Sequence, residues 1–287
     1  MDSSNISKYL IIGATGGTGK ELVDKLVSEG KKVAILVRNK TKAKSVLKDK
    51  YEKIDNVIEY ELGLSAVRGE VERKYNSELL NAIEWCDVLI STVGNVRGSD
   101  PQTSDYFATV ELLDHCQKSE SKFKNKLFVL VTTLFITRPY HFISFILNWI
   151  MPYVLGWKAL AENRVRQSGL NYLIVRPGGL TSREETKTVE VYQGDTVSGY
   201  ISRKNLANMI LYSITNSNVN KGQVTVDVIE KKKSGQSDTP VEITSFIKLD
   251  DENSIVTADH FRATRNITFV LYGILTLLVC YLVYRYK

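Results

Sequence analysis

The chain has 287 residues and a formal net charge of +6, from 38 Lys and Arg against 32 Asp and Glu. That length accommodates one α/β domain and little more, and the charge is too small and too scattered to indicate nucleic-acid binding. Its three cysteines, Cys86, Cys116 and Cys280, form no Cys-x-x-Cys pair, so they predict reduced thiols in a reducing compartment and no metal site.

A glycine-rich turn follows the first apolar run of the chain. The run Tyr9–Ile12 leads into Gly13-Ala-Thr-Gly-Gly-Thr-Gly19, and a helical pattern begins there. This order is typical of a dinucleotide site in a doubly wound fold. We expect Gly13 to allow the tight turn, Gly16 to let the backbone approach a pyrophosphate, and Gly19 to allow close packing of helix on strand, with the helix N-terminus facing the phosphates.

The same turn has two alternative roles that compete with dinucleotide binding. A Walker-type phosphate loop is disfavoured because Ala14 stands at its first glycine, and Glu21 rather than Ser or Thr follows Lys20. The turn can also be a plain strand-to-helix connection without a ligand. The next element favours the dinucleotide.

The second apolar run, Lys32–Val37, has the composition of a buried parallel strand and ends at Arg38. Enzymes that prefer NAD place an Asp or Glu about 20 residues after the glycines, where it binds the ribose 2′-hydroxyl. Arg38 suits a 2′-phosphate instead, so the sequence predicts NADP (NADPH) in preference to NAD. Lys40, Lys42 and Lys44 add positive charge there, or form a solvated helix face.

Helical and strand patterns then alternate along the chain. Helices are expected at residues 20–29, 41–47, 77–84, 103–117 and 203–214, and strands at 57–62, 88–92, 128–132, 172–175 and 224–229. The alternation predicts parallel βαβ units in one doubly wound (Rossmann) domain over residues 1–230. A polar linker is expected over 231–265, where Lys231–Lys233 would contact anionic lipid or form a solvated loop.

The last apolar run, Ile267–Tyr284, contains no charged residue and is 18 residues long. About 20 apolar residues span a bilayer core, so we expect a transmembrane tail anchor over 266–285 with membrane lipid as its partner. The head would then be cytosolic, on the endoplasmic reticulum or the mitochondrial outer membrane. The alternative is a buried C-terminal core helix.

A second apolar segment, Pro139–Trp157, is rich in Phe, Ile, Leu and Trp. Three interpretations are open: it lines a pocket or forms a lid for an apolar substrate, it lies in a membrane interface, or it is core. Pro152 and Asn148 argue against a second membrane span.

Several motifs together resemble the atypical short-chain dehydrogenase/reductase superfamily, in its NAD(P)H-binding, NmrA-like branch. They are the glycine turn with Arg38, Asp105-Tyr106-Phe-Ala108-Thr109, Lys158-Ala-Leu-Ala-Glu162, Ser168-Gly-Leu-Asn-Tyr172, Val175-Arg-Pro-Gly-Gly-Leu180 and Ile201-Ser-Arg203. The similarity extends from about Tyr9 to Ile229 and is strongest to the NADP-binding heads of redox-sensing chloroplast translocon subunits. It implies a cofactor-binding Rossmann head.

The resemblance also implies which residues contact the cofactor. Gly13, Gly16 and Gly19 match the phosphate loop, Thr15, Gly17 and Thr18 supply nearby donors, and Arg38 matches the residue that binds the 2′-phosphate. Thr92, Val93 and Gly94 match the backbone that passes the adenosine ribose, and Arg176, Pro177 and Gly178 match the turn beside the nicotinamide.

Catalytic residues are harder to assign. Classical superfamily members use Tyr-x-x-x-Lys, whereas Tyr153 and Lys158 are five residues apart and so lie roughly 140° apart around a helix. Thr132 and Thr133 occupy the place of the catalytic serine. His141 is an alternative acid, although a lone His beside an apolar helix is more often structural.

Two functions from different classes fit these residues. The first is a membrane-anchored NADP-dependent reductase of an apolar small molecule, with a non-standard acid/base site. The second is a non-catalytic NADP(H) redox sensor, or a scaffold subunit that binds a membrane-protein partner.

Overall fold

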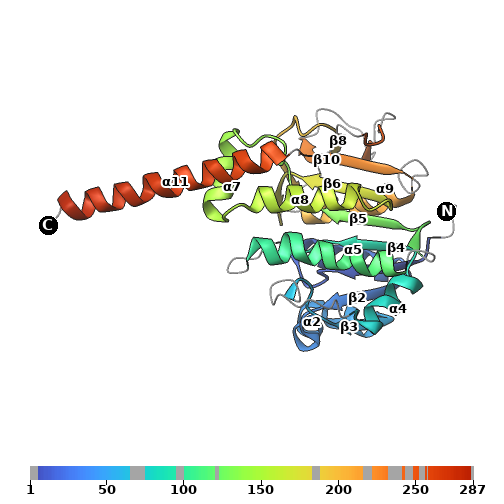
Figure 1. The fold of residues 1–287 in the computed structure, drawn as a ribbon. Coiled ribbons are helices and arrows are strands. Elements are labelled where there is room, and N and C mark those ends of the chain that lie inside the picture. The colour runs from blue at the N-terminus through green and yellow to red at the C-terminus, as the bar shows by residue number, and fades with distance from the viewer. Residues whose placement is uncertain are drawn as a thin grey trace.

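The structure is a computed structural model that describes residues 6–64, 75–94, 100–119, 123–182, 188–215, 222–231, 241–242, 248–251, 256 and 258–285. Within these residues a nine-stranded sheet has the order β11-β8-β10-β6-β5-β4-β1-β2-β3 (Figure 1). Its strands are β1 (Lys8–Ile12), β2 (Lys32–Val37), β3 (Asn56–Glu59), β4 (Val88–Ser91), β5 (Leu127–Val131), β6 (Asn171–Pro177), β8 (Thr188–Tyr192), β10 (Gln223–Lys231) and β11 (Val241–Glu242). A separate parallel pair joins β7 (Gly179–Thr181) to β9 (Tyr200–Ser202).

The strands from β3 to β10 pair in parallel, which confirms the predicted Rossmann-like α/β domain. Beyond β10 the sheet continues with β8, which is antiparallel, and the short β11. This edge was not predicted from the sequence, because a strand of five residues with mostly half-buried side chains gives a weak pattern.

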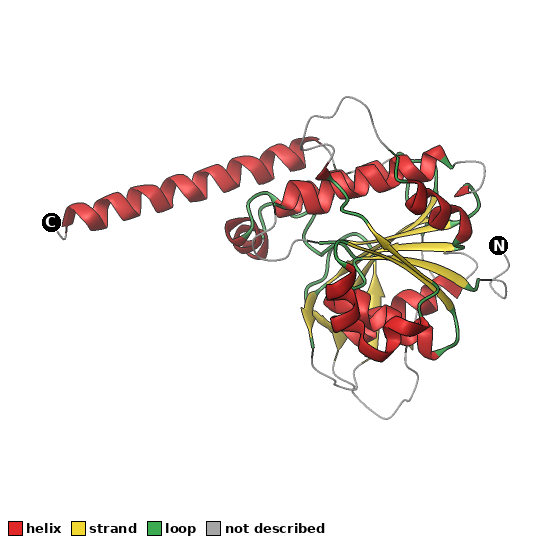
Figure 2. Ribbon diagram, turned by 90° about the horizontal axis from the view of Figure 1, so that it is seen from below, coloured by secondary structure: helices red, strands yellow, loops and turns green. Residues whose placement is uncertain are grey.

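Helices cover both faces of the sheet (Figure 2). One face carries α1 (Gly17–Ser28), α2 (Lys40–Leu47) and α9 (Arg203–Thr215), and the other carries α4 (Ser77–Trp85), α5 (Ala108–Lys118) and α8 (Val154–Arg166). Alternate β1 residues enter the two cores, Ile11 on the α1 side and Ile12 on the α5 side. Burial on both faces explains why the central strands are continuous apolar runs.

Polar side chains fix the starts of two of these helices. Asn39 Oδ1 accepts the Lys42 N–H at 2.7 Å where α2 begins, and Asn76 Oδ1 accepts the Leu79 N–H at 2.8 Å where α4 begins. Each amide satisfies one of the backbone donors that a helix N-terminus leaves unpaired. Two shorter helical segments, η2 (Lys48–Lys53) and η3 (Gln102–Phe107), follow α2 and precede α5.

Residues from the expected linker contact the sheet domain where they are described. Asp250 Oδ1 accepts the Thr225 N–H at 3.0 Å, and Arg166 Nε donates to Asp250 Oδ2 at 3.3 Å. The Val256 backbone pairs with the Asn163 side chain through bonds of 2.9 and 2.6 Å. The folded unit therefore includes contacts beyond residue 230. Lys232 and Lys233, for which lipid contact was one interpretation, lie outside the described residues.

The last helix, α11 (Ala258–Arg285), begins against α7 (Phe142–Ile150) and α8 and then projects away from the body (Figure 1). Among the described helices, none is by itself both long and apolar enough to cross a membrane. The apolar part of α11, Phe269–Arg285, falls short of that test, and α7 with α8 meets it only as a pair bent by 98°.

Candidate dinucleotide site

The glycine turn has the geometry that the sequence predicts for its first and last glycines. Gly13 adopts φ +84°, and a Cβ there would lie 2.9 Å from Thr92 Oγ1. At Gly19 a Cβ would lie 2.2 Å from the Gly13 carbonyl oxygen. A side chain at either position would strain the backbone or push α1 away from β1.

The segment Gly16–Thr18 leaves the start of α1 open to an anion. Gly16 is the N-cap residue in an extended conformation, no side chain caps the helix, and no acidic residue lies in its first turn. Gly16 and Gly17 are exposed, whereas Thr15 is half-buried and Thr18 is buried. Unpaired N–H groups and the positive end of the helix dipole favour a phosphate here.

Arg203 lies directly over this turn, although it was not predicted as a site residue. A Cβ on Gly17 would be only 2.5 Å from Arg203 Cδ and Nε, so the glycine makes room for the arginine side chain. Arg203 Nη1 also donates to Ser182 Oγ at 2.9 Å. Arg203 is the first residue of α9, so its charge lies near the positive ends of two helices. A cation there is unfavourable unless an anion lies beside it. The only sign of Arg203 in the sequence analysis was the Ile201-Ser-Arg203 motif that resembles the family.

Arg38 follows β2 at the same edge of the sheet, as the sequence predicts. Its Nη1 lies 3.8 Å from Glu61 Oε1, and both side chains are exposed. A long, exposed pair of this kind contributes little to stability, so Arg38 is free to turn toward a ligand. Glu61 competes for it, and the preference for NADP over NAD stays a prediction.

The carboxyl ends of β1 and β4 are tied together beside the turn. Thr92 Oγ1 donates to the Ile12 carbonyl at 3.0 Å and contacts the Gly13 carbonyl at 3.4 Å. The Thr92 side chain is therefore occupied inside the protein, and Val93 packs on the apolar core. At the end of β4, the backbone from Thr92 to Gly94 is therefore the part that is available to a ligand.

Lys158 reaches this edge from α8. Its Nζ lies 2.6 Å from Asp105 Oδ1 in η3, and the Asp105 side chain is only 1% exposed. A Cβ added to Gly94 would lie 3.6 Å from Lys158 Nζ and 3.7 Å from Asp105 Oδ1. The structure thus places Lys158 beside the predicted ribose-binding backbone, together with Asp105, which was not predicted as a site residue. Asp105 belongs to one of the resembling motifs, which was its only signal in the sequence.

Tyr153 contacts a different part of the molecule. It adopts φ +61° just before α8, and its ring packs edge-on against Phe269 of α11 at 5.8 Å between centroids. Lys158 instead contacts η3, so the two residues do not form a Tyr–Lys pair, in keeping with their five-residue spacing. His141, the alternative acid, caps α7: its Nδ1 accepts the Ile143 N–H at 3.2 Å and its ring stacks on Phe135.

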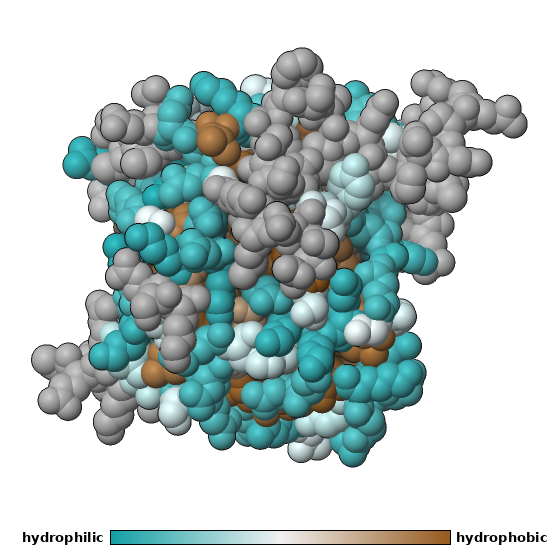
Figure 3. All heavy atoms as spheres, turned by 90° about the vertical axis from the view of Figure 1, so that its right-hand side faces the viewer, coloured by the Kyte–Doolittle hydropathy of each residue, from teal (hydrophilic) through white to brown (hydrophobic). Residues whose placement is uncertain are grey.

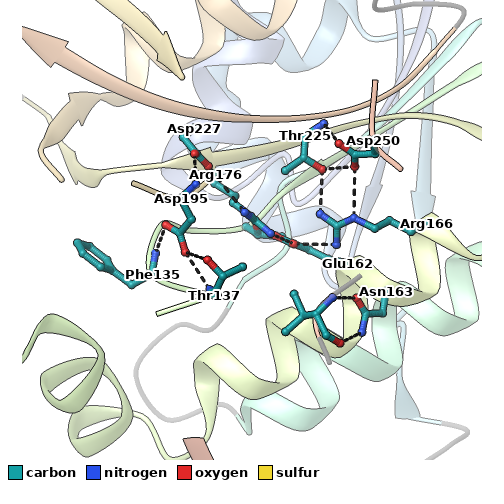
Figure 4. Close-up of polar contacts among 12 residues, drawn as sticks. Phe135, Thr137, Glu162, Asn163, Arg166, Arg176, Asp195, Thr225, Asp227 and Asp250 are labelled. Carbon is teal, nitrogen blue, oxygen red and sulfur yellow. Dashed lines mark hydrogen bonds and ion pairs between the residues drawn. The ribbon is translucent and has the colours of Figure 1, made fainter. Parts of the chain in front are cut away.

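Arg176 and Arg166 form a buried ionic network with Glu162 (Figure 4). Thr132 is hydrogen-bonded to the same carboxylate. Thr132 Oγ1 donates to Glu162 Oε1 at 2.7 Å, and Arg176 binds both carboxylate oxygens, at 3.0 and 2.6 Å. Arg166 Nη1 adds a second ion pair with Glu162 at 3.1 Å. Burial raises the pKa of Glu162, but the guanidinium groups of Arg176 and Arg166 outweigh it and lower that pKa to about 2. The Thr132 hydroxyl, just after β5, and the Arg176 guanidinium, on β6, thus bind α8 rather than point at a ligand.

Of the other predicted residues near the ends of β5 and β6, Gly178 and Pro177 contact the protein itself, whereas Thr133 is open to a ligand. Gly178 is enclosed, since a Cβ there would lie 2.4 Å from the Gly199 carbonyl oxygen. The Pro177 carbonyl accepts the Leu134 N–H at 3.1 Å. Thr133 is half-buried, and its hydroxyl makes no hydrogen bond within the described part of the chain. Thr133 therefore offers a hydroxyl at this edge to a ligand.

Two buried carboxylates, Asp195 and Asp227, support the segment that leads to α7 (Figure 4). Asp195 adopts φ +55° and accepts the N–H groups of Phe135 and Thr137 at 2.7 and 2.8 Å. The Asp195 N–H in turn donates to Asp227 Oδ2 at 2.5 Å. Burial raises the pKa of Asp227 to about 6, although Arg176 acts against it from 3.9 Å.

This fold and this turn define a Rossmann-type dinucleotide-binding protein. The sequence matches the profile of the NAD(P)H-binding family over residues 13–217, which is more than half of its length, and the chain belongs to that family. The predicted NAD(P)H-binding, NmrA-like identity is thereby confirmed, and a dinucleotide is its cofactor.

Two plant proteins illustrate the relationship. An uncharacterized chloroplastic protein of Arabidopsis thaliana is 32% identical over 220 residues, which are 72% of this chain and 71% of the relative. The chloroplastic protein TIC 62 of Oryza sativa subsp. japonica is 31% identical over 214 residues, 70% of this chain but only 41% of the relative. The chain therefore spans less than half the length of TIC 62.

Among solved structures, the fold is similar to that of ChuY, an anaerobillin reductase from Escherichia coli O157:H7. The TM-score is 0.60 with 21% sequence identity, over 80% of this chain and all (100%) of ChuY. At this level of identity the likeness shows the fold alone.

Proposed function

We propose that the chain is an NADP(H)-dependent reductase of an apolar small molecule, attached to a membrane and using a non-standard acid/base site. The observation that carries the nucleotide part is the position of Arg203 at the open start of α1. Arg203 lies over Gly17, and Arg38 stands where an acidic ribose ligand is expected in NAD enzymes. Arg203 beside the helix N–H groups, together with Arg38 at the end of β2, favours a cofactor with an extra phosphate.

The remaining residues of the site bind the hydroxyl groups of the ribose and the oxygen atom of the substrate. Nicotinamide, when bound, supplies a hydride to an electrophilic carbon. Lys158, held by Asp105 beside Gly94, binds ribose hydroxyls and orders the hydrogen bonds around them. Thr133 donates a hydrogen bond to the oxygen of the substrate. Tyr153 packs on α11 and does not pair with Lys158 as the tyrosine of classical members does, so proton supply differs from theirs.

The first test is a titration of the full chain in detergent with NADPH, NADP⁺, NADH and NAD⁺. We expect NADPH to bind at least tenfold more tightly than NADH, a difference of about 1.4 kcal/mol. A screen of apolar carbonyls and quinones for steady NADPH oxidation follows. Binding without turnover of any acceptor would contradict the reductase, and absence of binding would contradict the nucleotide site.

Arg38→Glu tests the assignment of the 2′-phosphate. We expect this substitution to weaken NADPH binding by at least tenfold while NADH binding changes little, because only NADPH carries the phosphate that Arg38 would contact. Lys44→Glu makes the same charge change on α2, where Lys44 pairs with Glu52 at 2.8 Å, and should leave the preference intact. Equal losses for both cofactors with Arg38→Glu would refute the assignment.

The second candidate function is an NADP(H) sensor or a scaffold subunit of a membrane complex. The position of Tyr153 against Phe269 favours it, since the residue that would supply a proton contacts α11 instead. A sensor must bind NADPH and NADP⁺ with different affinities and change its partner contacts accordingly. The same titration therefore distinguishes the two functions.

For the location we propose a tail anchor in the endoplasmic reticulum or the outer mitochondrial membrane, with a cytosolic head. The uncharged run Ile267–Tyr284 and its exposed apolar side chains support this. Resistance to alkaline extraction of cell membranes, and its loss on deletion of residues 266–287, would be the expected result. Extraction of the full chain into the soluble fraction would contradict it.

A further inference from the structure

The helix α7 buries its two polar residues and exposes several of its large apolar ones. Ser144 and Asn148 are fully buried, at 0% exposure, whereas Phe142 is 72% and Ile150 is 60% exposed. Ser144 Oγ donates to the Arg138 carbonyl at 2.6 Å, and Asn148 Oδ1 accepts the Leu155 N–H at 3.4 Å. These oxygen atoms thus have partners inside the protein. Ile143 and Leu147 pack inward as well, while Phe142 and Ile150 are exposed.

The exposed side chains form one surface, which we call the α7 outer face. It consists of Tyr140, Phe142, Ile146, Trp149 and Ile150. Residues 139–157 include no Asp, Glu, Lys or Arg, so the surroundings of this face are uncharged as well. Aromatic and aliphatic side chains without charges are typical of helices that lie in the boundary layer of a bilayer. By contrast, the described surface on the side opposite the free end of α11 is mostly hydrophilic (Figure 3).

The α7 outer face joins the apolar part of α11. The Trp149 and Tyr272 rings stack with an interplanar angle of 2° and centroids 6.0 Å apart, and Tyr272 Oη donates to the Trp149 carbonyl at 3.2 Å. Beyond this contact α11 exposes further large apolar side chains, including Leu277 and Val283. One continuous apolar surface therefore extends from α7 along α11.

The position of the contact along α11 favours lipid as the material that covers this surface. The uncharged run begins at Ile267, and Tyr272 is five residues further along, which is about 7.5 Å at 1.5 Å per residue. Interfacial helices lie at a depth of about 5–10 Å in the boundary layer. If the run enters a bilayer, α7 reaches that depth by its contact with Tyr272, and a second protein on the same face would have to displace lipid.

We propose that the α7 outer face lies in the membrane interface, so that the carboxyl edge of the sheet faces the bilayer and the site receives its apolar substrate from the lipid. This inference rests on the proposed tail anchor. Thr133 follows β5 at the edge where Gly94 and Lys158 also lie, and α7 is the next helix, beginning at Phe142. The substrate class is then a membrane-dissolved molecule with a reducible carbonyl or quinone group.

The test measures quenching of tryptophan fluorescence by brominated lipids in phosphatidylcholine vesicles that contain the full chain. We expect wild-type fluorescence to be quenched, and Trp149→Phe to lose more than half of that quenching. Trp85→Phe is the matched control, because Trp85 lies on α4 near Lys8, and it should lose none. Ile146→Ser with Ile150→Ser should reduce quenching without changing NADPH affinity.

The outcomes separate this inference from the functions proposed above. A chain that cosediments with vesicles but shows no quenching that depends on Trp149 would overturn the inference and leave the anchor intact. A chain that does not bind vesicles would refute both. Self-association of the vesicle-free chain that Ile146→Ser with Ile150→Ser abolishes, with no Trp149 quenching, would overturn it in favour of a second copy as the occupant. NADPH affinity and turnover are measured on the same samples and do not depend on these results.

Discussion

At the scale of single residues, the arginine that was missed in the sequence gives the sharpest prediction. Charge-assisted hydrogen bonds contribute about 1.5–3 kcal/mol, so Arg203→Ala should weaken binding of NADPH and NADH alike by about tenfold or more. The side chain lies at Gly17, beside the pyrophosphate end of the site, and not at Arg38. The measurement is calorimetric titration.

Lys204→Ala is the control for Arg203→Ala, since Lys204 is the next residue of α9 and is exposed. The Lys204→Ala variant should bind both cofactors with the affinity of the wild type. Gly17→Ala should act in the same direction as Arg203→Ala, because a Cβ 2.5 Å from Arg203 Cδ forces that side chain to move. Unchanged affinity in Arg203→Ala would remove Arg203 from the site.

A second prediction at this scale concerns Asp227 and pH. Its pKa is raised from 3.8 to about 6 in the folded protein, so the folded state binds the proton more tightly than the unfolded state. Deprotonation therefore costs stability, fully above pH 6, and the cost disappears as pH falls below about 4. We expect Asp227→Asn to be more stable than the wild type at pH 7, with the difference vanishing near pH 4.

Urea unfolding of the wild type and of Asp227→Asn at several pH values checks this prediction. Glu162 changes stability with pH in the opposite direction. Its pKa falls from 4.5 to about 2, so its contribution to stability is present above pH 4.5 and lost as pH falls toward 2. Both proteins share that loss, which therefore cancels in the comparison. An equal stability of the two proteins at pH 7 would contradict the raised pKa of Asp227.

At the scale of elements, the pattern of apolar residues along the sequence predicts most of the fold, but not the β8 edge of the sheet. The strands β1, β2, β4 and β5 are buried on both faces, so their apolar runs are unmistakable, and the glycine turn marks where α1 begins. The edge strand β8 has mostly half-buried side chains and depends on its contact with β10, which no local pattern encodes.

In the candidate site too, features set by local sequence could be predicted, and features set by contacts between distant segments could not. Backbone geometry at Gly13 and Gly19 follows from local sequence, and the structure agrees with it. Contacts made across the sheet do not: Arg176 and Thr132 matched family positions, yet Glu162 on α8 binds both side chains. Arg203 is the reverse case, because only the packing of α9 on α1 brings it to the turn.

At the scale of the whole molecule, the contacts of Asp250 and Val256 bear on where the folded unit ends. Asp250 accepts hydrogen bonds from Thr225 and Arg166 on two different elements, and Tyr172 Oη also donates to it at 3.0 Å. A head cut at residue 230, the boundary that the sequence predicts, loses Asp250 and leaves Arg166 and Tyr172 without that partner. Buried polar groups without partners cost about 1–3 kcal/mol each.

We therefore predict that a head of residues 1–265 unfolds at a higher urea concentration than a head of residues 1–230, by several kcal/mol in free energy. Asp250→Ala in the longer head should reproduce much of the loss, whereas Asp251→Ala, a matched change at the next residue, should not. Because the nucleotide turn is remote from these contacts in the sequence and lies on β1 and α1, both heads should bind NADPH while folded. Equal stability of the two heads would place the end of the folded unit at residue 230, and loss of NADPH binding in the longer head would make α11 part of the site.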